Sequence, residues 1–124
     1  MGNMVQQLVH PEPFPSADDG VSKYDPHYGF SGERKKREIP VPKEVLIAAK
    51  IPKAKRDYCV HFLLDLMTCQ RKKFPFPQNC RTELHHYDQC QYEDFVLRMK
   101  EYERERRLLA RDYRKERAAK AAAA

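Results

Sequence analysis

The four cysteines are the residues of this sequence whose type and spacing most clearly suggest chemistry. Cys59 and Cys69 bracket one segment, Cys80 and Cys90 bracket another, and nine residues separate the cysteines in each. Cysteine side chains can form structural disulfides, hold a metal ion or act as a catalytic dithiol. The choice among these depends on the elements that position the four sulfur atoms.

Neither a catalytic dithiol nor a zinc site fits this spacing. Catalytic dithiols lie close together in sequence so that one thiol can resolve the other, and the chain has no CxC or CxxC pair. Four sulfurs around one zinc ion must each lie about 2.3 Å from it, which cysteines three helical turns apart cannot achieve. His61, His85 and His86 show no ligand spacing, so we expect surface or packing roles for them. We predict structural disulfides, with no metal and no cofactor.

Each cysteine segment is free of Gly and Pro and carries one helical stripe. Apolar residues follow the cysteines at steps of three and four, which place them on one helix face; the stripes are Cys59, Phe62, Leu66 and Cys69, and Cys80, Leu84, Tyr87 and Cys90. The prolines of FPFPQN, residues 74–79, must interrupt the helix. The pattern therefore predicts two helices joined as an antiparallel hairpin.

Hairpin geometry specifies the disulfide pairing. Ten residues of helix rise about 15 Å, whereas a disulfide needs Cα atoms roughly 4.4–6.8 Å apart, so the two cysteines of one helix cannot pair. In an antiparallel hairpin, residues near the turn face each other, as do residues far from it. We predict the bridges Cys69–Cys80 and Cys59–Cys90.

The remaining segments complete an all-α prediction. We expect the first hairpin helix to span about 53–72, and the second to run far beyond Cys90, because no Pro interrupts residues 78–124. The predicted organisation is an extended N-terminal arm, a short helix with a linker, the hairpin, and a C-terminal helical extension, with boundaries 1–41, 42–52, 53–92 and 93–124.

Residues 1–32 of the N-terminal arm are acidic and rich in Gly and Pro, which favours an extended segment without a core of its own. Its aromatic cluster YDPHYGF, Tyr24–Phe30, is interpreted as a docking point. No apolar signal core or Arg-rich presequence is recognisable at the N-terminus. Gly2 is a candidate for myristoylation, although the motif asks for Ser or Thr where this chain has Gln6.

Composition limits how the fold can be stabilised and in which cellular compartment it can form. The chain has 124 residues, of which 34% are charged, and no Trp, so we expect only a small core that needs covalent support. The longest apolar run, VHFLLDLM, is too short to span a bilayer. Disulfides require an oxidising compartment. Without a signal peptide, the twin spacing indicates the mitochondrial intermembrane space.

With its two CX9C segments, the chain resembles the coiled-coil-helix-coiled-coil-helix (CHCH) family. The resemblance implies that a thiol oxidoreductase relay traps the chain in the intermembrane space during import. It also implies an apolar recognition stripe beside a cysteine, for which Phe62, Leu63 and Leu66 are the candidates.

The motifs RDYC, C…FPF…C and RMKEYERERRLL, with YGF, ERKKRE and the initial MG, are similar to the family of seventh beta-subcomplex subunits of mitochondrial NADH:ubiquinone oxidoreductase (complex I). This implies a non-catalytic accessory subunit, peripheral to the inner membrane, on the intermembrane-space face of the membrane arm. Its partners would be other complex I subunits of that arm. The alternative is a transient CHCH-type assembly or import factor.

Beyond Cys90, aromatic and aliphatic residues follow alternating steps of three and four. This seam is predicted to dock a partner subunit, and it comprises Tyr92, Phe95, Met99, Tyr102, Leu109 and Tyr113. The other interpretation is a solvated helix with scattered aromatics. A net charge of +6 also permits nucleic-acid binding. Acidic residues alternate with the arginines of this helix, however, and no recognition motif is present, so we expect no nucleic-acid partner.

Overall fold

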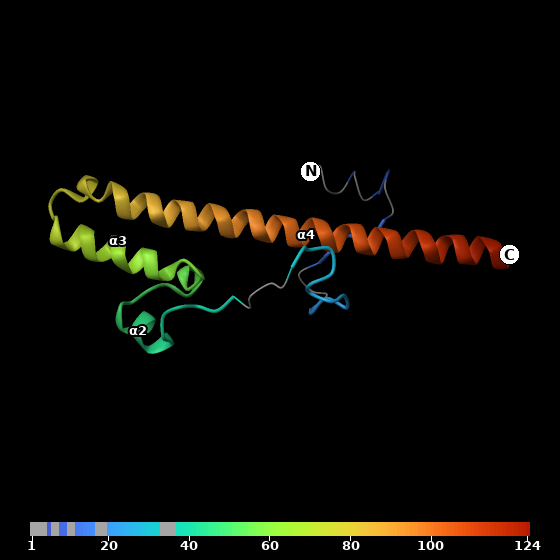
Figure 1. Ribbon diagram of the computed structural model, residues 1–124, viewed down its shortest axis with the longest axis horizontal. Helices are drawn as coiled ribbons and strands as arrows, with labels where there is room; N and C mark the ends of the chain where they lie inside the picture. The colour runs from blue at the N-terminus through green and yellow to red at the C-terminus, as the bar shows by residue number, and fades with distance from the viewer. Residues whose placement is uncertain (1–4, 6–7, 10–11, 17–19, 33–36) are drawn as a thin grey trace. The chain divides into compact units, whose positions relative to one another are not determined.

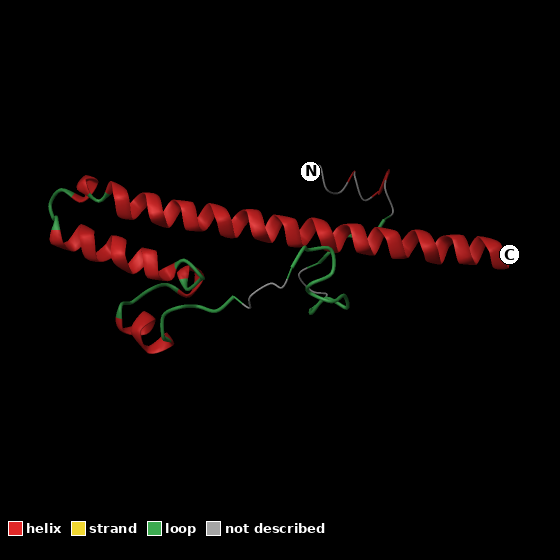
Figure 2. Ribbon diagram, viewed as in Figure 1, coloured by secondary structure: helices red, strands yellow, loops and turns green. Residues whose placement is uncertain are grey.

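The computed structural model describes residues 5, 8–9, 12–16, 20–32 and 37–124; Gly2 and Gln6 lie outside them. Within these ranges the regular elements are all helical, as Figure 2 shows, and the predicted all-α class is confirmed. The elements are α2 (Lys43–Ala48), the 3₁₀ turn η2 (Lys53–Lys55), α3 (Val60–Lys72), the 3₁₀ turn η3 (Pro77–Asn79) and α4 (Arg81–Ala123).

The proline-rich segment ends α3 and turns the chain back, as predicted. Pro77 occupies the start of η3, and the Phe76 N–H donates to the Lys73 carbonyl at 2.8 Å, which closes the turn. The chain then enters α4, whose first turns run antiparallel to α3 (Figure 1). The long C-terminal helix is also confirmed, since α4 has 43 residues without an internal Pro or Gly.

The first hairpin helix begins later than expected. We expected it to start near Lys53, but only η2 forms there and α3 begins at Val60. Arg56 leaves the helical region, with φ −87° and ψ 65°, and the Arg56 side chain donates to the Ile51 carbonyl at 2.9 Å. The Asp57 carboxylate accepts the Cys59 N–H at 2.9 Å, which forms a turn just before α3 begins.

Small apolar clusters form the core beside the hairpin. Leu46 of α2 packs with Ile51, Val60 and Leu63, and all four are buried. This packing depends on the end of α2, where Lys50 adopts a left-handed φ of 56° and the Ile51 N–H donates back to the Leu46 carbonyl at 3.0 Å. A second cluster contains Leu66 and the two cysteines of the inner pair, Cys69 and Cys80. Tyr87 packs against both clusters.

The chain divides into two compact units. One comprises residues 35–97 and contains α2, α3 and the beginning of α4. The other comprises residues 1–34 together with 98–124, so it joins the N-terminal arm to the C-terminal part of α4. Among the described residues, no helix combines the length and apolar character needed to cross a bilayer.

Candidate functional site

Two disulfides lock the hairpin with the predicted pairing. Cys59 and Cys90 form the outer bridge, with Cα atoms 5.8 Å apart, and Cys69 and Cys80 form the inner bridge, with Cα atoms 6.0 Å apart. No cysteine is free. Cys59 and Cys80 are fully buried, which shields the bridges from solvent reductants. The sulfurs are therefore structural in this fold.

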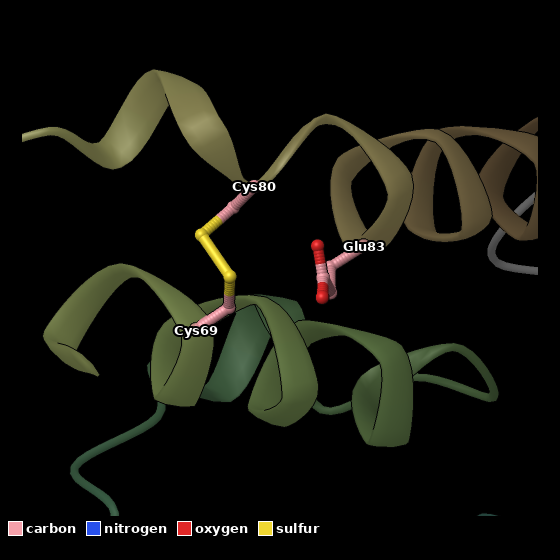
Figure 3. Close-up of side chains that lie close together, drawn as sticks. All are labelled: Cys69, Cys80 and Glu83. Carbon is pink, nitrogen blue, oxygen red and sulfur yellow. A yellow bond between two sulfur atoms is a disulfide. The ribbon is translucent and has the colours of Figure 1, made fainter. Parts of the chain in front are cut away.

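The inner bridge lies beside one carboxylate. Figure 3 shows Glu83, in the first turn of α4, next to the sulfurs of Cys69 and Cys80. The two sulfurs and one carboxylate oxygen lie within 4.8 Å of one another, a spacing that could surround a metal ion. Because both sulfurs are bonded to each other, they are not thiolates and offer little to a metal. Sequence reasoning did not single out Glu83.

Polar contacts that the sequence analysis missed reinforce the hairpin unit. The Gln91 amide donates to the Asp57 carboxylate at 2.7 Å, so the turn that precedes α3 is tied to α4. Asp94 is buried on α4 and forms an ion pair with Arg37, whose guanidinium lies 4.2 Å from the Tyr58 ring centroid. A buried carboxylate needs such a partner. Arg37 belongs to the basic motif ERKKRE, which is the one sequence feature that could have indicated a basic partner for Asp94.

The candidate import stripe is largely packed inside the folded hairpin. Leu63 and Leu66 are buried, one in each core cluster. Phe62 is half-buried, and its ring centroid lies 4.1 Å from that of His61 and 6.0 Å from that of His86. The stripe thus serves packing in the oxidised fold.

The predicted seam lies along α4 and differs in exposure from residue to residue. In the hairpin unit, Tyr92 is 67% exposed and Phe95 is 53% exposed. In the other unit, Met99 is 51% exposed and Tyr102 is 49% exposed, whereas Leu109 and Tyr113 are half-buried. Leu109 and Tyr102 line a groove with arm residues that include Val21 and Lys23. The arm of the same chain therefore covers part of the seam.

Arg104 holds the aromatic cluster of the arm against α4. Its Nη1 donates to the carbonyls of Asp25, Pro26 and Tyr28 at 3.0, 2.9 and 3.3 Å. Its guanidinium also lies 5.3 Å from the ring centroid of Phe30. Gly29 has a φ of 84°, which glycine adopts without strain and which allows the turn to wrap the arginine. The segment YDPHYGF, interpreted above as a docking point, thus contacts α4 of its own chain.

A second arm contact joins the Tyr24 hydroxyl to the Asp112 carboxylate, at 2.6 Å. Burial, followed by this hydrogen bond, raises the pKa of Tyr24. The donated hydrogen bond, helped by Arg111 and Lys23, lowers the pKa of Asp112. Arg111 additionally donates to the Tyr28 hydroxyl at 3.1 Å. The arm is therefore held by both charge and hydrogen bonding.

Between these contacts, an open groove of about 800 Å³ lies in the unit that contains the arm. Its apolar lining comes from both segments of that unit, and includes Tyr28, Phe30, Met99, Tyr102 and Leu108. At its rim, Glu103 accepts hydrogen bonds from Arg106 and Arg107, which lower its pKa to about 2. Acidic and basic side chains thus neutralise each other along this stretch of α4.

The fold and its bridges define a class: two CX9C segments closed as an antiparallel hairpin by two disulfides are the architecture of a twin CX9C (CHCH) protein. The chain belongs to the family of the NADH-ubiquinone oxidoreductase B18 subunit (NDUFB7), whose family model matches residues 41–102.

Curated relatives support this membership. The chain is 45% identical over 107 residues to NADH dehydrogenase [ubiquinone] 1 beta subcomplex subunit 7 of Caenorhabditis elegans, covering 86% of each chain. It is 41% identical over 108 residues to the protein of the same name from Bos taurus, covering 87% of this chain and 74% of the relative. The Arabidopsis thaliana protein of that name is 36% identical over 63 residues, covering 51% of this chain and 61% of the relative. The names of these relatives describe a subunit of the beta subcomplex of NADH dehydrogenase [ubiquinone].

Proposed function

We propose that this chain is a non-catalytic accessory subunit of mitochondrial complex I, held on the intermembrane-space face of the membrane arm by contacts with other subunits. The observation that carries the proposal is family membership combined with a hairpin closed by two disulfides. Disulfides persist in oxidising compartments, which favours the intermembrane-space side over the matrix. The predicted segment 53–92 contains the disulfide-closed hairpin, whose first helix begins at Val60, and the segments 1–41, 42–52 and 93–124 extend it.

The exposed part of the seam supports docking to a partner subunit. Tyr92 and Phe95 are large, more than half exposed, and one helical step apart on α4. Aromatic side chains of this kind dominate the energetics of protein interfaces, because they bury much area with few rotatable bonds. We assign the partner-docking role to the whole predicted seam, because Met99 and Tyr102 are also exposed.

We assign import recognition to the unoxidised chain. Leu63 and Leu66 are buried once the hairpin closes, so a relay oxidoreductase could reach them, together with Phe62, only before folding. Oxidation would then hide the stripe and trap the chain. Gly2 would add peripheral membrane association if it carries an acyl chain; a single myristoyl group gives only marginal, reversible binding.

The experiment that tests the proposal expresses tagged variants in mitochondria and follows their co-migration with complex I by blue-native electrophoresis and mass spectrometry. Tyr92→Asp and Phe95→Asp should deplete the subunit from the complex, because a carboxylate buried in an apolar contact costs several kcal/mol without a partner. Gln89→Asp is the matched control, since it adds the same charge at an exposed position of the same helix.

A wild-type chain that never co-migrates with the complex, and remains in a soluble pool, would refute the subunit role and favour a transient assembly or import factor. Assembly of Tyr92→Asp and Phe95→Asp at wild-type levels would show that the seam is only a solvated helix face. Non-reducing peptide mapping must show both bridges in each variant, so that loss of assembly reflects the contact and not the fold.

A further inference from the structure

The turn that joins α3 to α4 (Figure 1) contains two exposed phenylalanines, Phe74 and Phe76. Phe74 is 81% exposed and Phe76 is 58% exposed, whereas smaller side chains of the same unit, such as Leu63 and Leu66, are buried. A large ring left in water at a folded turn forgoes the stabilisation that burial gives. Neither ring belongs to the predicted seam, and neither contributes to a core cluster. The exposure therefore points to something that covers the turn.

The same turn is strongly cationic. Residues 70–82, which we call the cationic tip, contain no acidic residue and four basic ones, namely Arg71, Lys72, Lys73 and Arg81. All four are exposed. The nearest acidic residues in sequence are Asp65 and Glu83, which line a hollow with Lys72 and Lys73 at the base of the tip. Glu83 also lies beside the inner disulfide there (Figure 3). With two carboxylates against four basic side chains, the tip keeps a positive excess. The ligand complementary to this surface is anionic with an apolar part.

The backbone of the tip is suited to an apolar surrounding. Pro75 and Pro77 have no N–H, and the Phe76 N–H already donates to the Lys73 carbonyl at 2.8 Å. The Asn79 and Cys80 N–H groups donate to carbonyls within the tip, at 3.3 and 3.1 Å. An apolar phase cannot replace water as a hydrogen-bond partner, so a segment with few unsatisfied donors enters it at low cost.

The tip is also held in shape before any ligand binds. The inner bridge joins its base, since Cys69 and Cys80 flank the turn. The Lys73 amine donates to the Asn79 carbonyl at 2.9 Å, which ties the two sides together. A preorganised turn loses less conformational entropy on binding than a flexible loop does.

From these observations we infer that the cationic tip is a membrane-contacting surface, which places Phe74 and Phe76 among the headgroups of an anionic lipid bilayer while its four basic residues bind lipid phosphates. Aromatic rings flanked by Lys and Arg suit the membrane interface, and clustered basic residues are attracted by anionic lipid. An acidic protein partner would also attract the charge. It would not account for the proline-rich backbone, which has few donors to offer a protein surface. The inference does not depend on membership of the respiratory complex.

The test uses the full-length oxidised chain, expressed without N-terminal acylation, in a vesicle co-sedimentation assay. Vesicles of phosphatidylcholine alone are compared with vesicles that also contain phosphatidylglycerol. We expect binding to the anionic vesicles that weakens as salt is added, because the attraction is partly electrostatic. Phe74→Ser/Phe76→Ser should weaken this binding by about tenfold or more, which corresponds to the loss of about 1.4 kcal/mol. Lys72→Gln/Arg81→Gln should weaken the preference for anionic vesicles, because it removes two of the four basic residues of the tip.

Matched controls come from the same unit. Val45→Ser/Ile47→Ser removes two exposed apolar side chains from α2, and Lys53→Gln/Lys55→Gln removes two exposed charges from η2. Both controls should bind as the wild-type chain does, and all variants should retain both disulfides. If the wild-type chain binds neither vesicle, or the control pairs weaken binding as much as the tip pairs do, the inference is wrong. If vesicle binding is absent but Phe74→Ser/Phe76→Ser prevents assembly with other subunits, the tip contacts protein and the lipid assignment is refuted.

Discussion

Breaking the outer bridge should reveal how much covalent closure stabilises the hairpin. The bridged residues are separated by 31 positions in the outer bridge and by 11 in the inner one. Because the inner bridge already shortens the chain within the outer loop, the effective loop is about 20 residues (31 − 11). The chain-entropy relation then gives a contribution of about 3 kcal/mol. The core clusters are small, so this is a large fraction of the stability.

A double-mutant cycle isolates that contribution. Cys59 is fully buried and Cys90 is half-buried, so Cys59→Ala and Cys90→Ala leave different cavities and different orphan thiols. Each nevertheless removes the same bridge, so the two losses should not add. The sum of the two single costs should exceed the cost of the double variant by about 3 kcal/mol.

Urea denaturation under non-reducing conditions measures these free energies of unfolding. Far-UV circular dichroism follows all helices, and amide hydrogen exchange at Leu63 and Leu66 reports on the hairpin itself. A coupling below about 1 kcal/mol would refute the reasoning, because it would mean that packing and not the bridge closes the hairpin. In mitochondria, the abundance of the Cys59→Ser and Cys90→Ser variants should fall together for the same reason.

Three further predictions concern the arm and the sulfurs. Arg104→Ala should release the arm turn from α4, so the amides of Tyr28 and Phe30 should exchange faster while the hairpin amides are unchanged; equal protection would contradict the role of Arg104. The Tyr24–Asp112 contact should weaken at both pH extremes. Because the pKa of Tyr24 is raised, the stability that its hydroxyl contributes is present below the usual pKa of 10.0 and is lost as pH rises through the raised pKa. Because the pKa of Asp112 is lowered, the stability that its carboxylate contributes is present above the usual pKa of 3.8 and is lost as pH falls through the lowered pKa. An NMR titration of the Tyr24 ring checks this, and loss of the contact near neutral pH would contradict it. The oxidised chain should lack thiol oxidase activity, NADH oxidation and stoichiometric zinc, since its four sulfurs are paired; zinc found by elemental analysis after non-reducing purification would overturn that expectation.

The structure also refines how the seam should be tested. Replacing Leu109 by Asp probes a residue that lines a groove with the arm of its own chain, so a loss of partner binding there could reflect release of the arm. Tyr92 lies in the hairpin unit and is the most exposed seam residue, so substitution there separates partner contact from arm contact.

Local pattern and covalent geometry were sufficient for the hairpin. The all-α class, the turn at the paired prolines, the long α4 and the pairing of all four cysteines could be predicted because each depends on spacing along one or two helices. A helix has a constant rise and period, so residues at fixed separations have nearly fixed positions relative to one another. The same constancy excludes a disulfide between the two cysteines of one helix on sequence grounds alone.

Contacts between distant segments could not be derived this way. Arg104 meets the arm carbonyls across 76 to 79 positions of sequence, and Tyr24 meets Asp112 across 88. No periodicity connects residues so far apart, and in the sequence Arg104 is one of several arginines in a mixed-charge run. The late start of α3 was missed because helix propensity favours residues 53–59, whereas the Arg56 and Asp57 side chains hydrogen-bond to nearby backbone groups and divert the chain. Where the backbone depends on a particular side-chain hydrogen bond, only the tertiary structure decides the outcome.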